Sequence, residues 1–285
     1  VDTGSGMLKL GGTVTYANAN DPETAVITGS MTLNGATRTF TANNSVAPGA
    51  LVDLDVPASI SGGANQGLTK GGAGVLRLSG INTFDGALTI ANNGGILILA
   101  HPQAAGAPGA ARALSVGSAA SLALDGANGD ITLPANYPTL SLNGVGNTLL
   151  SPVGGALMNL AGTNTVPAAI TLVNNTYLAS LSGKLILGGN FNAGTARALS
   201  IYGDGDTELA GVLSTGVSTL YKPGGGTLTL SGTGANTFSG LTTVNGGKLA
   251  LYKADGANAV NAIAGGGVTI NSSGAVEYAA SSPNP

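Results

Sequence analysis

Hydrophobic and polar residues alternate along much of the chain. The stretches "GVLRLS" (74–79), "GALTIA" (86–91), "GTLTLS" (226–231) and "GKLALY" (247–252) place an apolar residue at every second position. A period of two is typical of strands that bury one face. Gly, Asn, Asp and Ser gather between such stretches every 8–12 residues or so, which is typical of turns. The pattern predicts an all-β chain of short strands.

Signals for helices are nearly absent. The best candidate is "QAAGAPGAARAL" (103–114), and it is interrupted by Gly106, Pro108 and Gly109, which disfavour a helix interior. The chain has 48 glycines in 285 residues and only 8% charged residues. That composition is also typical of low-complexity tails. However, 43% of the residues are hydrophobic and they alternate in order, which indicates a folded protein.

One phrase occurs twice in the chain. Residues 68–86 read "LTKGGAGVLRLSGINTFDG" and residues 220–240 read "LYKPGGGTLTLSGTGANTFSG". Self-similarity of this kind indicates a solenoid whose coils stack on one another. We therefore interpret residues 1–285 as a single β-solenoid with two long repeats, 1–152 and 153–285.

A right-handed parallel β-helix fits this pattern best. Each coil would contribute short strands that pair with the coils above and below at about 4.8 Å. At about 22 residues per coil, the chain would form about 13 coils. Asn and Gly would turn the corners in left-handed backbone conformations. The positions expected in the core are Leu76, Leu78, Phe84, Ile90, Leu97, Leu99, Leu228, Leu230, Phe238, Val244, Leu249 and Leu251, and those expected at corners are Asn82, Gly86, Asn236 and Gly240.

The two motifs resemble the passenger-associated transport repeat of autotransporters, also called the autotransporter-associated β-strand repeat. The resemblance covers residues 67–99 and 219–251. Phe84 and Phe238 stand where the family often has Tyr. The resemblance implies a structural module of secreted bacterial surface proteins, which helps them to fold and to reach the cell surface. It brings no catalytic residues with it.

Composition excludes several classes of partner and chemistry. The chain has no Cys, so a disulfide scaffold, a Cys-based zinc site and a Cys nucleophile are excluded. The formal net charge is −3, and no basic patch interleaved with aromatic residues is present, so we expect no nucleic-acid partner. No run approaches 18 apolar residues, so we expect no membrane insertion by this segment. The chain begins with Val1, and we interpret it as a piece of a longer protein.

Acidic residues form two candidate sites. Asp53 and Asp55 in "LVDLDV" are two positions apart, so we expect them on one strand face, the outer one. Paired carboxylates can serve a glycosidase, but two solvated acids are the favoured interpretation. Asp204, Asp206 and Glu208 in "GDGDTE" also alternate, and their oxygens could hold calcium. A polar turn is favoured there.

Three other residues could in principle serve catalysis or phosphate binding, and we consider both roles improbable. His101 is the one histidine, and it lies in a turn context between an apolar run and Pro102. A catalytic triad would need a Ser and an Asp near it in space. Lys70 and Lys222 lie in glycine-rich segments that lack the phosphate-loop pattern. We expect them at corners, where their long side chains cover apolar surface.

The sequence favours a structural function without a cofactor and without enzymatic activity. We expect an extracellular or cell-surface rod with a structural or adhesive role. Its partner would be another copy of itself, stacked end to end as a filament subunit, or else a surface or host carbohydrate or protein. Its open strand edges could pair with another copy. The alternative is a polysaccharide-binding or polysaccharide-cleaving β-helix. Ile96 and Ile98 in "GGILILA" would form an outward apolar patch for a partner, unless a loop such as residues 103–112 covers them.

Overall fold

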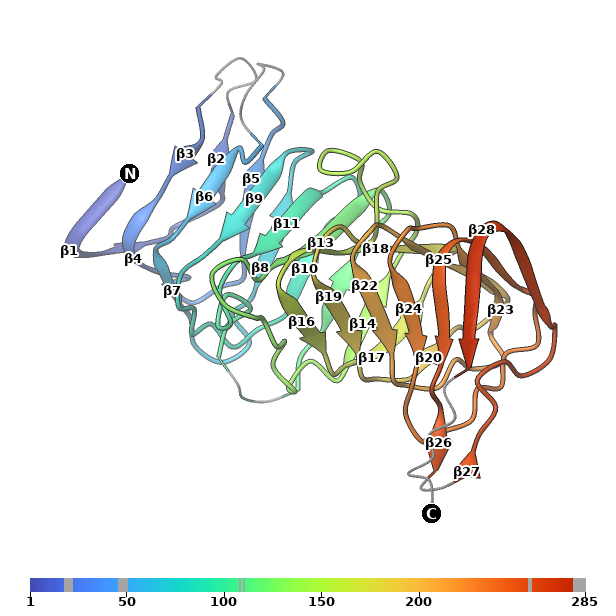
Figure 1. Ribbon diagram of the computed structural model, residues 1–285. Coiled ribbons are helices and arrows are strands. Elements are labelled where there is room, and N and C mark those ends of the chain that lie inside the picture. The colour runs from blue at the N-terminus through green and yellow to red at the C-terminus, as the bar shows by residue number, and fades with distance from the viewer. Residues whose placement is uncertain (18–22, 46–50, 108, 110, 256–257, 279–285) are drawn as a thin grey trace.

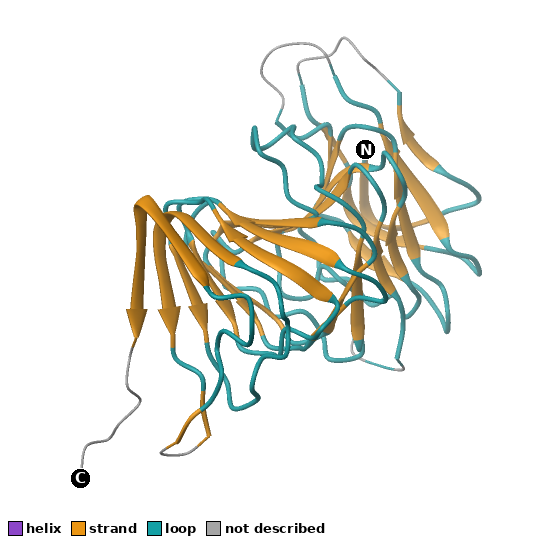
Figure 2. Cartoon of the chain, turned by 90° about the vertical axis from the view of Figure 1, so that its right-hand side faces the viewer, coloured by secondary structure: helices purple, strands orange, loops and turns teal. Residues whose placement is uncertain are grey.

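The computed structural model describes residues 1–17, 23–45, 51–107, 109, 111–255 and 258–278. These residues form strands, turns and loops and no helix (Figure 2), and so none of them forms a helix that could cross a membrane. The parallel strands stack as a β-solenoid of about 11 turns, from the N-terminal end in blue to the C-terminal end in red (Figure 1). The predicted all-β solenoid is confirmed, and its right-handed winding stays a prediction.

Parallel sheets form the walls of the solenoid. The first sheet has the order β1 (Asp2–Lys9), β4 (Thr28–Thr32), β7 (Ser59–Ser61). The second sheet has the order β2 (Val14–Tyr16), β5 (Arg38–Ala42), β8 (Leu68–Gly71), β10 (Leu88–Ile90), β12 (Leu114–Val116), β14 (Thr139–Leu142), β17 (Ala169–Leu172), β20 (Phe191–Asn192).

The third sheet is the longest and covers two walls. One wall is made of β3 (Ala25–Val26), β6 (Leu54–Val56), β9 (Val75–Leu78), β11 (Gly95–Leu99), β13 (Ala120–Asp125), β15 (Leu157–Ala161), β18 (Thr176–Ser180), β21 (Arg197–Tyr202), β23 (Val217–Lys222) and β25 (Thr242–Leu251). The other wall is made of β16 (Thr163–Val166), β19 (Lys184–Leu187), β22 (Asp206–Leu209), β24 (Thr227–Leu230), the second half of β25, and β28 (Val268–Tyr278). The short strands β26 (Ala254–Asp255) and β27 (Asn258–Ala259) form an antiparallel pair.

The strand register stacks like residues on like residues. Leu88 pairs with Leu68 on one side and with Leu114 on the other. In the third sheet, Leu97 lies between Leu76 and Leu122 in the same way. These side chains are buried in one continuous core cluster. Parallel pairing in register therefore turns a period of two along the chain into apolar columns that run along the solenoid.

The coils are less uniform, and on average longer, than the sequence suggests, so the expected 13 coils are too many. Leu68 and Leu88 pair at a separation of 20 residues, whereas Leu122 and Leu157 pair at a separation of 35. The extra residues lie in loops, which lengthen a coil at a small entropic cost. About 11 turns result.

A second apolar cluster lies outside the main core, on the outer side of the third sheet. It contains Ile96 and Ile98, which are 0% and 4% exposed. Leu150, in the loop of residues 143–156, and Val52 pack against it. Ile96 and Ile98 therefore do not form an exposed patch, and the described hydrophobic residues that pack against their cluster come from other segments than 103–112.

Candidate functional site

The repeated motif contributes the same core residues in both copies. Leu76 pairs with Leu97, and in the second copy Leu228 pairs with Leu249. The other expected core positions follow the same arrangement, and all of them are buried except Leu251, which is half-buried against the core. Phe84 and Phe238 are fully buried. The two motifs thus have the same register and the same packing.

Asn82 lies in the loop between β9 and β10, and its side chain points into the core, where it is 0% exposed. Its Oδ1 accepts the backbone N–H of Ile60 at 2.9 Å, and its Nδ2 donates to the carbonyl of Ala104 at 2.8 Å. Ile60 precedes Asn82 by one coil, and Ala104 follows it by one coil. We call this arrangement an asparagine clamp, because one side chain joins three successive coils.

Asn236 forms the second asparagine clamp. Its Oδ1 accepts the N–H of Leu213 at 2.9 Å, and its Nδ2 donates to the carbonyl of Ala262 at 2.7 Å. The sequence predicts both asparagines at corners and gives no sign that their side chains turn inward. Asn is common in turns for its own backbone preference, so its presence there gives no sign of a buried role.

The reason why positions 86 and 240 need glycine also differs from the expected left-handed corner. Neither residue has a positive φ. A Cβ at Gly86 would overlap the backbone of Gln66 and Gly67, and one at Gly240 would overlap the carbonyl of Ser218. Glycine is needed because the preceding coil approaches closely, and not because the backbone is left-handed.

Lys70 lies near the end of β8, next to the turn of residues 72–74, and its side chain is fully buried instead of covering apolar surface from outside. Its Nζ donates to the carbonyls of Gly71 at 2.7 Å, Gly72 at 2.8 Å and Gly94 at 2.7 Å. Burial lowers the pKa of Lys70 to about 7, and the charge of Asp53 opposes this shift. We call this a lysine clamp, because the ammonium group ties two coils together through backbone oxygens.

Lys222 forms the equivalent lysine clamp and is 2% exposed. Its Nζ donates to the carbonyls of Gly224 and Gly246, two positions that correspond to Gly72 and Gly94. Burial lowers the pKa of Lys222 to about 8, and the charges of Asp204 and Asp206 oppose this shift. Both motifs therefore carry one asparagine clamp and one lysine clamp.

The carboxylates of Asp53 and Asp55 have different surroundings. Asp53 is 1% exposed and accepts the N–H groups of Ser45 and Val75, both at 2.7 Å. Asp55 is half-buried and pairs with Arg77 at 3.5 Å. The expectation of two solvated acids is therefore wrong for Asp53, whose carboxylate holds neighbouring segments of backbone together.

The structure does not bring Asp204, Asp206 and Glu208 together as a metal site. Asp206 accepts the N–H of Thr227 at 2.7 Å, and Glu208 pairs with Lys184 at 2.6 Å. In the part of the chain that the structure describes, no group of three or more acidic, His or Cys side chains could hold a metal ion.

His101 lies in the turn that follows β11, where its Nδ1 accepts the N–H of Gln103 at 3.0 Å. This contact orders the turn, as a polar side chain commonly does. The structure thus places His101 in the turn context that the sequence indicates.

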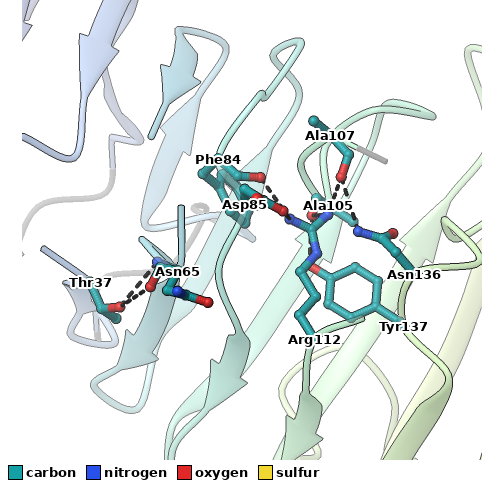
Figure 3. A network of polar contacts seen from close by, with 10 residues as sticks. Thr37, Asn65, Phe84, Asp85, Ala105, Ala107, Arg112, Asn136 and Tyr137 are labelled. Carbon is teal, nitrogen blue, oxygen red and sulfur yellow. Dashed lines mark hydrogen bonds and ion pairs between the residues drawn. The ribbon is translucent and has the colours of Figure 1, made fainter. Parts of the chain in front are cut away.

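Arg112 is a buried residue whose contacts the sequence does not predict (Figure 3). Its guanidinium donates to the carbonyls of Phe84 at 2.7 Å and Ala107 at 2.6 Å, and it lies 3.8 Å from Asp85. It also lies over the ring of Tyr137, 4.5 Å from the ring centroid. We call this group the arginine cluster. An Arg in an Ala- and Gly-rich loop gives no signal of such a role.

Comparisons with known proteins agree with the repeated geometry. The family model of the passenger-associated-transport-repeat matches residues 68–99 and 220–251. The chain is also 37% identical over 118 residues to the Adhesin BmaC autotransporter of Brucella suis biovar 1 (strain 1330). That match covers 41% of this chain and 3% of the length of the relative. No solved structure matches the chain. The chain thus carries two passenger-associated transport repeats, as the sequence predicts.

Proposed function

We propose that the chain is a structural and adhesive segment of an autotransporter passenger, on the bacterial surface or secreted from it, and that it is not an enzyme. The observation that carries the proposal is the pair of clamps, which recurs in both repeats. Each asparagine joins the coils before and after its own, and each lysine donates to its own turn and to the next coil. Such clamps fix the stacking of coils and leave the outer faces free for contact. The similarity to an autotransporter adhesin supports the same function.

Surface display tests the proposal. The chain is displayed on a non-adherent bacterium, and attached bacteria are counted on host epithelial cells. We expect attachment to rise severalfold, and to be lost when Leu228→Asp disrupts the solenoid. Full display, measured by protease release of the chain from intact cells, with no gain in attachment would contradict the adhesive function.

A second candidate function is end-to-end stacking into filaments. Among the described residues, β28 pairs on one side only, with β25, and its Ile270 and Tyr278 are 52% and 65% exposed. An open strand edge with apolar residues can pair with another copy. At about 4.8 Å per coil, one copy would add roughly 50 Å to a filament.

Electron microscopy of the purified chain tests this second candidate. Fibres with that axial repeat would support it, and isolated short rods at high protein concentration would count against it. The polysaccharide-binding or polysaccharide-cleaving alternative stays a hypothesis, as does the division into two long repeats at residue 152.

A further inference from the structure

An open groove of about 600 Å³ lies on the outer side of the solenoid. Leu150 and Val153, from the loop of residues 143–156, line one part of it, and Pro223 and Gly225, from the turn after β23, line another. Tyr202 and Asp204, at the end of β21 and just beyond it, also line the groove. The groove is therefore mostly apolar, with one aromatic ring and one carboxylate.

The ring of Tyr202 is held in place by its neighbours. Its centroid lies 4.8 Å from that of Tyr177 and 6.5 Å from that of Tyr221, which belong to the strands on either side. Tilted and edge-on pairs of this kind are favourable arrangements of aromatic rings. The ring is thus a fixed surface rather than a freely rotating side chain.

Asp204 is exposed and forms no ion pair within 4 Å in the described part of the chain. Its carboxylate lies against Gly225, since a Cβ at position 225 would come 2.5 Å from its Oδ1. The nearby ammonium of Lys222 is buried and donates to backbone carbonyls instead. A carboxylate that forms no ion pair within 4 Å among the described residues therefore lines the groove.

The arginine cluster shows what such a combination binds within this same protein. There a guanidinium lies over a tyrosine ring, near a carboxylate, and donates to backbone carbonyls (Figure 3). The groove offers the ring of Tyr202, the carboxylate of Asp204 and a backbone of glycines on an open surface. We propose that this groove binds an arginine side chain of a protein partner.

An arginine side chain is complementary to the ring, the carboxylate and the apolar walls of the groove. A guanidinium is attracted to the face of an aromatic ring and can donate two hydrogen bonds to one carboxylate. Its aliphatic stem packs on apolar walls such as Pro223. The partner cannot add a strand at this place, because β21 already pairs with β18 and β23. Recognition therefore occurs through a side chain, and the proposal deepens the adhesive function by naming the chemistry of its partner.

NMR titration of the folded chain with a capped Gly-Gly-Arg-Gly-Gly peptide tests the inference. We expect shifts at the amides of residues 202–204 and 224–225, and at least tenfold weaker binding of the matched peptide in which citrulline, uncharged and of the same shape, replaces arginine. Asp204→Asn should weaken binding by at least tenfold. Asp2→Asn removes an exposed carboxylate far along the chain and should leave binding unchanged.

A second variant tests the groove without changing the charge of the protein. Gly225→Ala should displace the carboxylate of Asp204, because its Cβ would collide with Oδ1, and should weaken binding while the other amide signals stay in place. Absence of shifts, equal binding of the citrulline peptide, or shifts produced by maltose instead would overturn the proposal. Peptide binding without cell attachment would contradict the adhesive function alone, so the two failures are distinguishable.

Discussion

Single buried polar residues give the repeat its specificity. A lysine or an asparagine in an apolar column is unfavourable unless its donors and acceptors are satisfied, and the clamps satisfy them with backbone groups of neighbouring coils. A slip of one coil by one residue would leave these groups unpaired. The clamps therefore fix the register that alternating leucines alone define less sharply.

The lysine clamps predict that stability depends on pH. Burial lowers the pKa of Lys70 from 10.5 to about 7. Between these values the unfolded chain binds more protons than the folded one, so the free energy of unfolding rises as the pH rises, by at most about 1.4 kcal/mol per pH unit. Lys70→Met should flatten this slope in urea unfolding between pH 7 and 10. Lys9→Met, at an exposed position, serves as the control, and an unchanged slope in Lys70→Met would sink the prediction.

Removal of an asparagine clamp should destabilise both repeats to a similar extent. Asn82→Ala and Asn236→Ala each leave a buried N–H and a buried carbonyl without a partner, at a cost of about 2–5 kcal/mol. Urea unfolding measures the loss. Asn174→Ala, in an exposed turn, should change the free energy of unfolding by less than about 0.5 kcal/mol. Equal effects of the three substitutions would refute a special role for the clamps.

Strands form where the period of two is clear, and they keep the predicted faces inward. The positions of Leu76 and Leu228 in the core follow directly from the pattern, because alternate residues of a strand face opposite sides. The pattern fails to show how the cluster that contains Ile96 and Ile98 is covered, since Leu150 packs against this cluster from a loop about 50 positions away. It also gives no coil length, because loops of many lengths close the same turn.

Leu228→Asp tests the inward face of β24. The substitution buries an unpaired charge between β22 and β25, which should abolish the cooperative unfolding transition. Thr171→Asp places the same charge on the outward face of β17 and should keep the β-type circular dichroism spectrum and the melting temperature. An unchanged melting temperature for Leu228→Asp would show that its side chain does not face the core.

The whole molecule is a stack in which each coil contacts mainly its neighbours. Stability in such a stack is distributed among repeats and the interfaces between them. The loop of residues 143–156 departs from this rule, because Leu150 packs over the second apolar cluster, to which several strands contribute. The loop also forms one wall of the groove that we assign to an arginine side chain.

Two adjacent leucines in this loop test its structural role. Leu150→Ser should lower the free energy of unfolding by about 1–3 kcal/mol and raise the binding of a hydrophobic dye, because it removes a side chain that packs against the second apolar cluster. Leu149 is 40% exposed, so Leu149→Ser should change either measurement little. Equal effects of the two substitutions would show that the loop does not cover the cluster.

The sequence by itself determined the strands, their inward leucines, the solenoid and the two transport repeats, because these follow from local periodicity and self-similarity. Tertiary structure alone decided that Asn82 and Lys70 form buried clamps and that Asp53 is buried. It also decided the contacts of Arg112 in the arginine cluster and the place of Tyr202 and Asp204 in the groove. The physical reason is that a polar side chain takes its role from the donors, acceptors and rings around it. In this solenoid many of these groups, such as Gly94 for Lys70 and Ala104 for Asn82, come from coils 20 or more residues away, which no local pattern records.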